Sequence, residues 1–115
     1  MTPTLYGIPN CDTVKKARNW LDAQGIAYAF HDYKKAGIDT ATLSAWCNAV
    51  GWEKVLNRAG TTFRKLPDTA KIDIDEAGAL AIMQNQPSCI KRPIVTHDGV
   101  LLIGFHEAEW AAALG

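Results

Sequence analysis

A lone cysteine, Cys11, is the residue of this chain whose type and setting best suit chemistry. It follows a short apolar run that Pro9-Asn10 breaks, and it precedes a lysine-bearing stretch with helical character in YGIPNCDTVKKA. A thiol at the start of a helix meets unpaired N–H groups and the positive end of the helix dipole, which lower its pKa and favour the reactive thiolate. Free cysteine is also often buried. The helix-start context favours a working thiol over a small core residue.

The other cysteines fit chemistry less well. Cys47 lies on the apolar stripe of a predicted helix, so packing accounts for it. Cys89, in PSCIKRP, either acts as a resolving thiol for Cys11 or fills an apolar gap. An odd number of cysteines with no CxxC pair is a poor framework for disulfides or a zinc site. We therefore expect free thiols in a reducing compartment.

Two arginines stand where they could serve an anion. Arg92 precedes Pro93, which favours an extended backbone and permits a cis peptide bond, and an arginine held there presents a planar fork of donors. Arg58 follows the short helical stretch WEKVL, in a loop. For either arginine alone, an ordinary surface charge is the simpler explanation. The histidines have no metal-like spacing, so we predict no metal site.

Length and composition indicate one folded domain. The 115 residues suffice for one hydrophobic core, and 48% hydrophobic with 21% charged residues is ordinary for a globular protein. Twelve basic residues balance twelve acidic ones, which argues against nucleic acid or an anionic membrane as a partner. No signal peptide is evident, and no apolar run approaches the ~18 to 20 residues that span a bilayer. We expect a cytoplasmic location.

The first third of the chain is typical of a βαβ unit. An apolar segment over residues 3–8 predicts a buried strand, and 26–33 predicts a second. Between them, apolar positions at helical spacing predict a helix over 12–24, with Asn10 as a candidate N-cap and Gly25 as a stop. Such units join parallel strands by a right-handed crossover.

The remainder predicts helices and then a hairpin. Helices are expected over 39–51 and 75–87, the second ended by Pro87. Two apolar runs flank Asp98-Gly99, a strong hairpin signal, and 106–114 closes the chain as a helix. The element order therefore predicts an α/β fold, a mixed four-stranded sheet flanked by helices.

Three motifs resemble a known family. LYGIPNCDTVKKAR, VLNRAGTTFRKL and IKRPIV, in this order over about residues 4–114, resemble the ArsC-like arsenate reductases, most closely their YffB branch, with the Spx regulators as cousins. The resemblance implies a thioredoxin-like fold, here one domain over 1–115, with a helical insertion over about 38–87 between the second and third strands. It implies Cys11 as the nucleophile and Arg92 and Arg58 as the family's anion-binding arginines.

The sequence departs from its relatives at three positions. Gly7 stands where glutathione-using arsenate reductases carry a histidine, and Gly104 stands where they carry a third arginine. Arsenate turnover is therefore not favoured, because the site has one charge fewer for an oxyanion and less help in lowering the thiol pKa. Val14 occupies the second cysteine position of the Spx CxxC motif, so that disulfide switch is missing.

The resemblance predicts a glutathione-dependent thiol oxidoreductase that uses Cys11 alone. No cofactor is expected to be bound; glutathione is the co-substrate, a disulfide or mixed disulfide is the substrate, glutaredoxin is a candidate partner, and the protein is expected to be a monomer. Three alternatives stay open: an arsenate reductase linked to glutathione and glutaredoxin, a Spx-like redox-sensing partner of RNA polymerase, and a remnant with a packed, inert Cys11. The predicted binding residues are Asn10, Asp12, Thr13, Arg58, Arg92 and Pro93.

Overall fold

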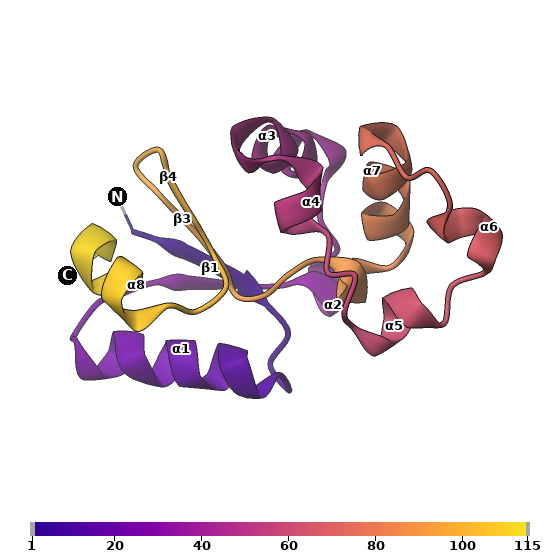
Figure 1. Ribbon diagram of the computed structural model, residues 1–115. Helices are drawn as coiled ribbons and strands as arrows, with labels where there is room; N and C mark the ends of the chain where they lie inside the picture. Colours follow the sequence, from indigo (N-terminus) through magenta and orange to yellow (C-terminus); the bar gives the residue numbers. More distant parts are fainter. Residues whose placement is uncertain (1, 115) are drawn as a thin grey trace. The chain divides into compact units, whose positions relative to one another are not determined.

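The computed structural model describes residues 2–114, and the chain separates into two compact units (Figure 1). Unit 1 combines the residues up to Ala36 with those from Arg92 onward, and unit 2 comprises Gly37–Lys91. Within residues 2–114, every strand lies in unit 1, and unit 2 is built from helices. The prediction that the whole chain is a single domain stays a prediction.

A mixed four-stranded sheet forms the centre of unit 1. Its strands are β1 (Thr4–Gly7), β2 (Ala29–Asp32), β3 (Ile94–His97) and β4 (Val100–Ile103), in the order β2-β1-β3-β4. The pair β1–β2 is parallel, and the pairs β1–β3 and β3–β4 are antiparallel. The predicted sheet is confirmed. Its order and directions are those of a thioredoxin-like fold.

The crossover between the parallel strands is helix α1 (Asp12–Ala23), which runs alongside β1 and β2 in Figure 1. The helix follows from its sequence because the predicted apolar positions fall on one face. The C-terminal helix α8 (Glu107–Leu114) adds Trp110 to the same core. These helices and the sheet enclose one hydrophobic cluster, whose buried members are Leu5, Val14, Ala17, Leu21, Val95 and Trp110.

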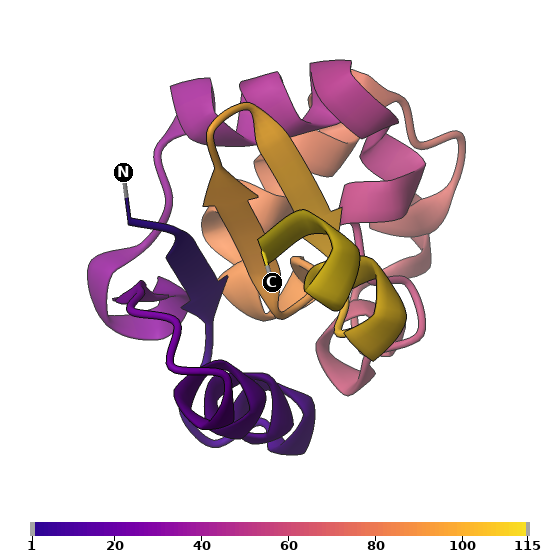
Figure 2. The same cartoon turned by 90° about the vertical axis from the view of Figure 1, so that its left-hand side faces the viewer.

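The hairpin between β3 and β4 turns at the predicted dipeptide (Figure 2). Asp98 has φ 47° and Gly99 has φ 81°, the left-handed pair that a two-residue turn requires. Asparagine, aspartate and glycine tolerate this region best, which is why the dipeptide signals a hairpin.

Unit 2 forms the helical insertion between β2 and β3. Asp39 caps the first long helix by accepting a hydrogen bond from the Thr42 N–H at 2.7 Å, and Asp75 caps the second through Gly78 at 2.8 Å. Both capped helices were predicted, whereas Pro87 begins a short 3₁₀ turn beyond the second one. The helical elements are α3 (Thr40–Val50), α4 (Trp52–Val55), α5 (Thr61–Arg64), α6 (Asp68–Lys71), α7 (Glu76–Asn85) and η1 (Pro87–Cys89).

The second predicted strand is shorter than expected. Ile26 donates its N–H to the Leu21 carbonyl at 3.0 Å, so the chain is still leaving α1 at that point. At the other end Asp32 accepts from the Lys34 N–H at 2.9 Å and starts the short helix α2 (Tyr33–Ala36). These local hydrogen bonds compete with the strand and limit it to four residues.

No helix within residues 2–114 has the length and apolar character needed to cross a membrane.

Candidate active site

Cys11 is the N-cap residue of α1, with φ −83° and ψ 127°. The prediction that Asn10 is the cap and Cys11 lies in the first turn is wrong by one residue. The Cys11 N–H donates to the Ile8 carbonyl at 3.1 Å, which forms the tight turn after β1. The Cys11 carbonyl accepts from the Lys15 N–H at 2.9 Å and so begins the helix. The Cys11 thiol therefore lies at the N-terminus of α1.

The surroundings of Cys11 favour its thiolate. Burial raises the pKa of the Cys11 thiol. The backbone N–H of Val14, the Arg92 side chain and the backbone N–H of Thr13 lower it, and together they outweigh burial. The pKa of Cys11 therefore lies below its ordinary value. The side chain forms no cap hydrogen bond of ordinary geometry. The N–H groups nevertheless lie where a negative sulfur would attract them, as expected at a helix start. Partial burial does not outweigh these donors.

Arg92 reaches the sulfur from the turn before β3. Its side chain hydrogen-bonds the Cys11 sulfur and also acts on it through charge. The Arg92–Pro93 peptide bond is cis, and Pro93 is buried. The structure thus brings Arg92 to the Cys11 sulfur, although the two residues lie more than eighty positions apart in the sequence.

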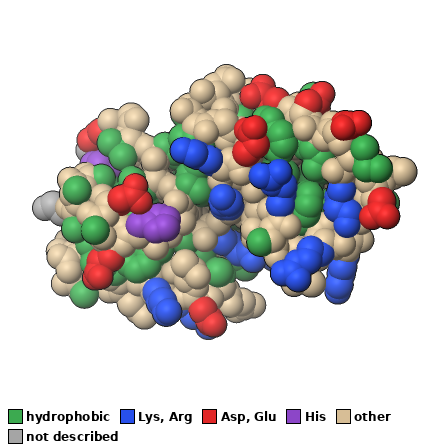
Figure 3. All heavy atoms as spheres, viewed as in Figure 1, with side chains coloured by type: hydrophobic (Ala, Val, Ile, Leu, Met, Phe, Trp, Pro, Cys, Tyr) green, Lys and Arg blue, Asp and Glu red, His purple; other side chains and the backbone are tan. Residues whose placement is uncertain are grey.

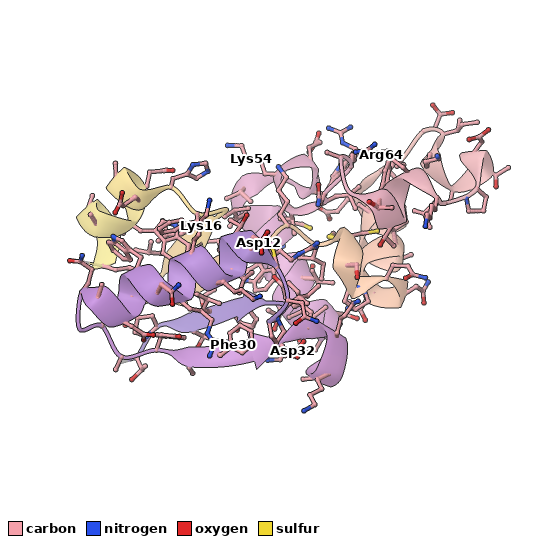
Figure 4. All side chains as sticks on the ribbon, turned by 90° about the horizontal axis from the view of Figure 1, so that it is seen from below. Asp12, Lys16, Phe30, Asp32, Lys54 and Arg64 are labelled. Carbon is pink, nitrogen blue, oxygen red and sulfur yellow. The ribbon has the colours of Figure 1, made fainter. Side chains whose placement is uncertain are left out.

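The residues flanking the thiol contribute backbone more than side chain. Asn10 and Thr13 are exposed, and so is Asp12, which stands at the first position of α1 (Figure 4). Thr13 was predicted and supplies its N–H. Val14 was not predicted, yet its N–H is the leading favourable contact of the sulfur. The contact with Val14 could have been predicted if Cys11 had been taken as the N-cap, because an N-cap side chain lies near the N–H groups two and three residues later in the sequence.

Arg58 belongs to unit 2. It is exposed, it follows α4, and its guanidinium carbon lies 5.7 Å from the centre of the Trp52 ring. The neighbouring α5 region carries further Lys and Arg side chains, visible as a blue group in Figure 3. Nearby, Arg64 donates twice to the Ala59 carbonyl, at 3.1 and 2.7 Å, and so fixes the loop after Arg58. An approach of Arg58 to Cys11 stays a prediction.

The two other cysteines are inside unit 2. Cys47 is 3% exposed on α3 and Cys89 is 1% exposed in η1. Burial, and then the charge of Glu76, raise the pKa of Cys47. This is the opposite direction from Cys11. Packing accounts for Cys47 as predicted, and a resolving role for Cys89 stays a prediction.

Three aromatic side chains that the sequence did not mark, Tyr6, His31 and Tyr33, lie against one another in unit 1. Tyr6 and His31 are register partners across β1 and β2, with ring centres 5.0 Å apart, and Tyr6 stacks on Tyr33 at 6.2 Å. Burial raises the pKa of Tyr33 well above its ordinary value, Tyr6 adds to this, and the positive charge of Arg92 opposes it. Arg92 is therefore close enough to act on both Tyr33 and Cys11. The aromatic-rich stretch 26–33 was the available signal.

The departures from the arsenate reductases have structural reasons. A Cβ atom added at Gly7 would lie 2.8 Å from the Val14 Cγ2 atom, closer than packed atoms allow, so α1 leaves no room for a side chain there. Gly104 has φ 76°, a conformation that favours glycine, and a Cβ there would lie 3.2 Å from His106 Nε2. In this chain, the Val14 side chain excludes a side chain at Gly7, and the left-handed backbone disfavours one at Gly104.

Among residues 2–114 no group of three or more His, Cys, Asp or Glu side chains could hold a metal ion.

Comparison with known proteins agrees with the family resemblance seen in the sequence. The model of the ArsC family matches residues 6–113. A solved structure described as a YFFB protein is 56% identical, with a TM-score of 0.97 over 99% of this chain and 100% of that chain. A solved structure from Brucella melitensis, described as an arsenate reductase (ArsC) related protein, is 54% identical, with a TM-score of 0.79 over 97% of this chain and 93% of its own.

Similar sequences are also found among other bacterial proteins. An uncharacterised protein of Haemophilus influenzae is 44% identical over 96% of both chains. Proteins named global transcriptional regulator Spx, from Streptococcus and other bacteria, are 27% to 30% identical. The resemblance to the YffB branch, with Spx proteins further away, is confirmed.

Proposed function

The chain belongs to the ArsC family, and from that premise we propose that it is a thiol oxidoreductase whose single nucleophile is Cys11 and whose co-substrate is glutathione. One observation carries the proposal: the N–H groups at the start of α1 and the Arg92 side chain together favour the Cys11 thiolate. The thiolate is the form that attacks a disulfide sulfur. The burial of Cys47 and Cys89 supports a cycle that needs one cysteine.

The cycle consists of two exchanges. In the first, the Cys11 thiolate attacks the glutathione sulfur of a mixed disulfide, a Cys11–glutathione bond forms, and the substrate leaves as a thiolate that takes a proton from water. In the second, the thiolate of free glutathione attacks the glutathione sulfur bound to Cys11. Oxidised glutathione leaves and the Cys11 thiolate is regenerated. The net reaction converts a mixed disulfide and one glutathione into a substrate thiol and oxidised glutathione.

The lowered pKa of Cys11 serves both exchanges. In the first it raises the fraction of attacking thiolate, and in the second it makes Cys11 a better leaving group. While Cys11 is bound to glutathione, its sulfur carries no negative charge, and Arg92 is proposed to contact a glutathione carboxylate. Arg58 is proposed to hold a second anionic group. Asn10, Asp12 and Thr13 shape the loop, and Pro93 forms the turn beside the sulfur.

The test of this function is mass spectrometry after exposure to oxidised glutathione, followed by a turnover assay on a glutathionylated peptide. We expect one glutathione adduct, on Cys11, none in Cys11→Ser, and turnover that the same substitution abolishes. Cys47→Ser is the matched control and should retain both. A Cys11–Cys89 disulfide would replace the single-cysteine cycle, and an adduct without turnover would argue against an enzyme.

The Spx relatives are named global transcriptional regulators, and this favours a second candidate function, regulation of transcription. The resemblance to the Spx regulators implies that such a protein would act as a redox-sensing partner of RNA polymerase. Val14 in place of a second cysteine weighs against a switch of the CxxC kind. Co-purification with polymerase, together with no activity on glutathionylated peptides, would support the regulator over the enzyme.

The description of the Brucella structure favours a third candidate, arsenate reduction. The lack of space at Gly7 and the left-handed backbone of Gly104 weigh against it, since both positions are closed to the side chains that arsenate reductases place there. A steady-state assay with arsenate, glutathione and glutaredoxin decides the matter. Turnover that is lost in Cys11→Ser would favour arsenate as the substrate.

A further inference from the structure

We propose that Trp110, on the C-terminal helix, is a positioning residue for the thiol site and acts through the backbone of Gly104 on the Arg92–Pro93 turn. The inference rests on the proposed role of Cys11 and deepens it. Trp110 itself is not placed against the substrate. It is assigned the task of holding the turn from which Arg92 reaches the sulfur.

A chain of hydrogen bonds carries the proposal. The indole Nε1–H of Trp110 donates to the Gly104 carbonyl at 3.0 Å. The N–H of Gly104 donates in turn to the Pro93 carbonyl at 2.8 Å. Pro93 is the neighbour of Arg92, whose side chain hydrogen-bonds the Cys11 sulfur. The bond from Trp110 to Gly104 and the bond from Gly104 to Pro93 both lie within unit 1 and have ordinary donor–acceptor distances.

Gly104 can link Trp110 to Pro93 because its backbone adopts a left-handed conformation. Its φ of 76° lies in the left-handed region. In this conformation its N–H reaches Pro93 while its carbonyl accepts from Trp110. A side chain at position 104 would be strained there, and its Cβ would approach His106 Nε2 at 3.2 Å. The residue thus works as a backbone link, which explains why glycine stands at this position.

Packing fixes the other side of the Trp110 ring. Trp110 is fully buried in the cluster that contains Val14, and Cys11 packs against that cluster. Phe105 meets the ring edge-on with centres 4.9 Å apart, and Trp20 does so at 6.3 Å. One side chain therefore contacts the core that supports the start of α1 and also holds the turn that carries Arg92. Both groups of donors to the sulfur depend on these two elements.

The contact between the Arg92 side chain and the Cys11 sulfur is sensitive to small displacements. A charge-assisted hydrogen bond weakens steeply as its distance and angle depart from the optimum. Loss of the indole N–H leaves the Gly104 carbonyl without that donor and loosens the link to Pro93. Arg92 then has more freedom relative to Cys11, and the thiolate loses part of its stabilisation.

The experiment compares Trp110→Phe with Trp20→Phe, a matched tryptophan of the same aromatic group. The rate of Cys11 alkylation is measured across pH in each protein, and circular dichroism checks that each is folded. We expect Trp110→Phe to shift the pH profile upward and to slow alkylation at neutral pH by roughly two- to fivefold. Trp20→Phe should leave the profile in place.

A second pair of variants separates positioning from loss of packing. Site-specific β-(3-benzothienyl)alanine at position 110 keeps the bicyclic shape and lacks the N–H, so it should shift the profile as Trp110→Phe does, even if Trp110→Phe fails to fold. In an Arg92→Met background the same replacement should produce no further shift. An unchanged profile with benzothienylalanine, an equal shift in Trp20→Phe, or a full shift without Arg92 would each overturn the proposal.

These readouts are independent of the proposed function. A shifted alkylation profile in a protein that turns over no glutathionylated peptide would support the role of Trp110 and reject the oxidoreductase. Normal turnover of the wild type, together with an unshifted alkylation profile in the Trp110 variants, would support the oxidoreductase and reject the role of Trp110.

Discussion

The reactivity assigned to Cys11 results from opposing contributions at one sulfur atom. Burial favours the neutral thiol, whereas the Val14 and Thr13 N–H groups and the Arg92 side chain favour the thiolate. The second group prevails because the thiol is only partly buried, so its desolvation is incomplete. The same residue type inside unit 2, Cys47, has no such donors and its pKa moves the other way.

Arg92→Met should raise the pKa of Cys11, because it removes both a hydrogen bond and a positive charge from the sulfur. We expect alkylation at neutral pH to slow by about threefold to tenfold, and Arg92→Lys to have an intermediate effect, since an ammonium keeps the charge without the planar fork. The pH profile of alkylation measures the change.

Arg18→Met is the control for this substitution. Arg18 lies in the same unit, but its Nε–H donates to the Tyr28 hydroxyl at 3.0 Å and its guanidinium carbon lies 4.3 Å from the centre of the Phe30 ring. The control should leave the Cys11 profile in place. An identical shift in both variants would contradict a specific role for Arg92.

At the scale of elements, the close fit of α1 against the end of β1 sets the position of the helix start. Gly7 lies in the strand with a backbone that any residue could adopt, so space alone requires glycine there. The Val14 side chain occupies the place where a Cβ of residue 7 would be. The same residue that donates its N–H to the sulfur thus also anchors the first turn of α1 to the sheet.

Gly7→Ala should destabilise the protein by about 1 to 3 kcal/mol, because the added methyl group overpacks a filled site. In a Val14→Ala background, which vacates that space, the same substitution should cost clearly less. Urea unfolding of the wild type, both single variants and the double variant gives the coupling energy. Equal costs in both backgrounds would show that Val14 is not the group that excludes a side chain.

At the scale of the whole molecule, the ionisation of Cys11 is linked to folding. Its folded pKa lies below its ordinary value, so the folded state releases the thiol proton at a lower pH than the unfolded chain. The resulting stabilisation is absent below the folded pKa, grows as the pH rises, and is complete above the unfolded pKa. The sign is therefore greater stability at higher pH.

This linkage is measurable as the difference in the free energy of unfolding between the wild type and Cys11→Ser. We expect this difference to shift in favour of the wild type from about pH 6 to about pH 9. Cys47 and Tyr33, whose pKa values are raised, contribute equally to both proteins and cancel. A difference that stays flat, or that falls with pH, would contradict a stabilised thiolate.

Local patterns predicted most elements because their signals act over a few residues. The apolar spacing of α1, the Asp39 cap and the Asp98-Gly99 turn are confirmed. The errors lie at element ends, where competing hydrogen bonds are equally local. Asn10 and Cys11 are both plausible caps by type, and only the turn bond from the Cys11 N–H to Ile8 selects the second.

The sequence by itself determined that a thiol stands at a helix start, that a mixed sheet supports it, and which family the chain resembles. The tertiary structure decided that Arg92 reaches the sulfur, that Val14 excludes a side chain at Gly7, and that Trp110 is linked to Pro93 through Gly104. The physical reason is range. Helix periodicity, caps and turns depend on neighbours in the chain, whereas these contacts join residues that only the pairing of β1 with β3 and the packing of α8 bring together.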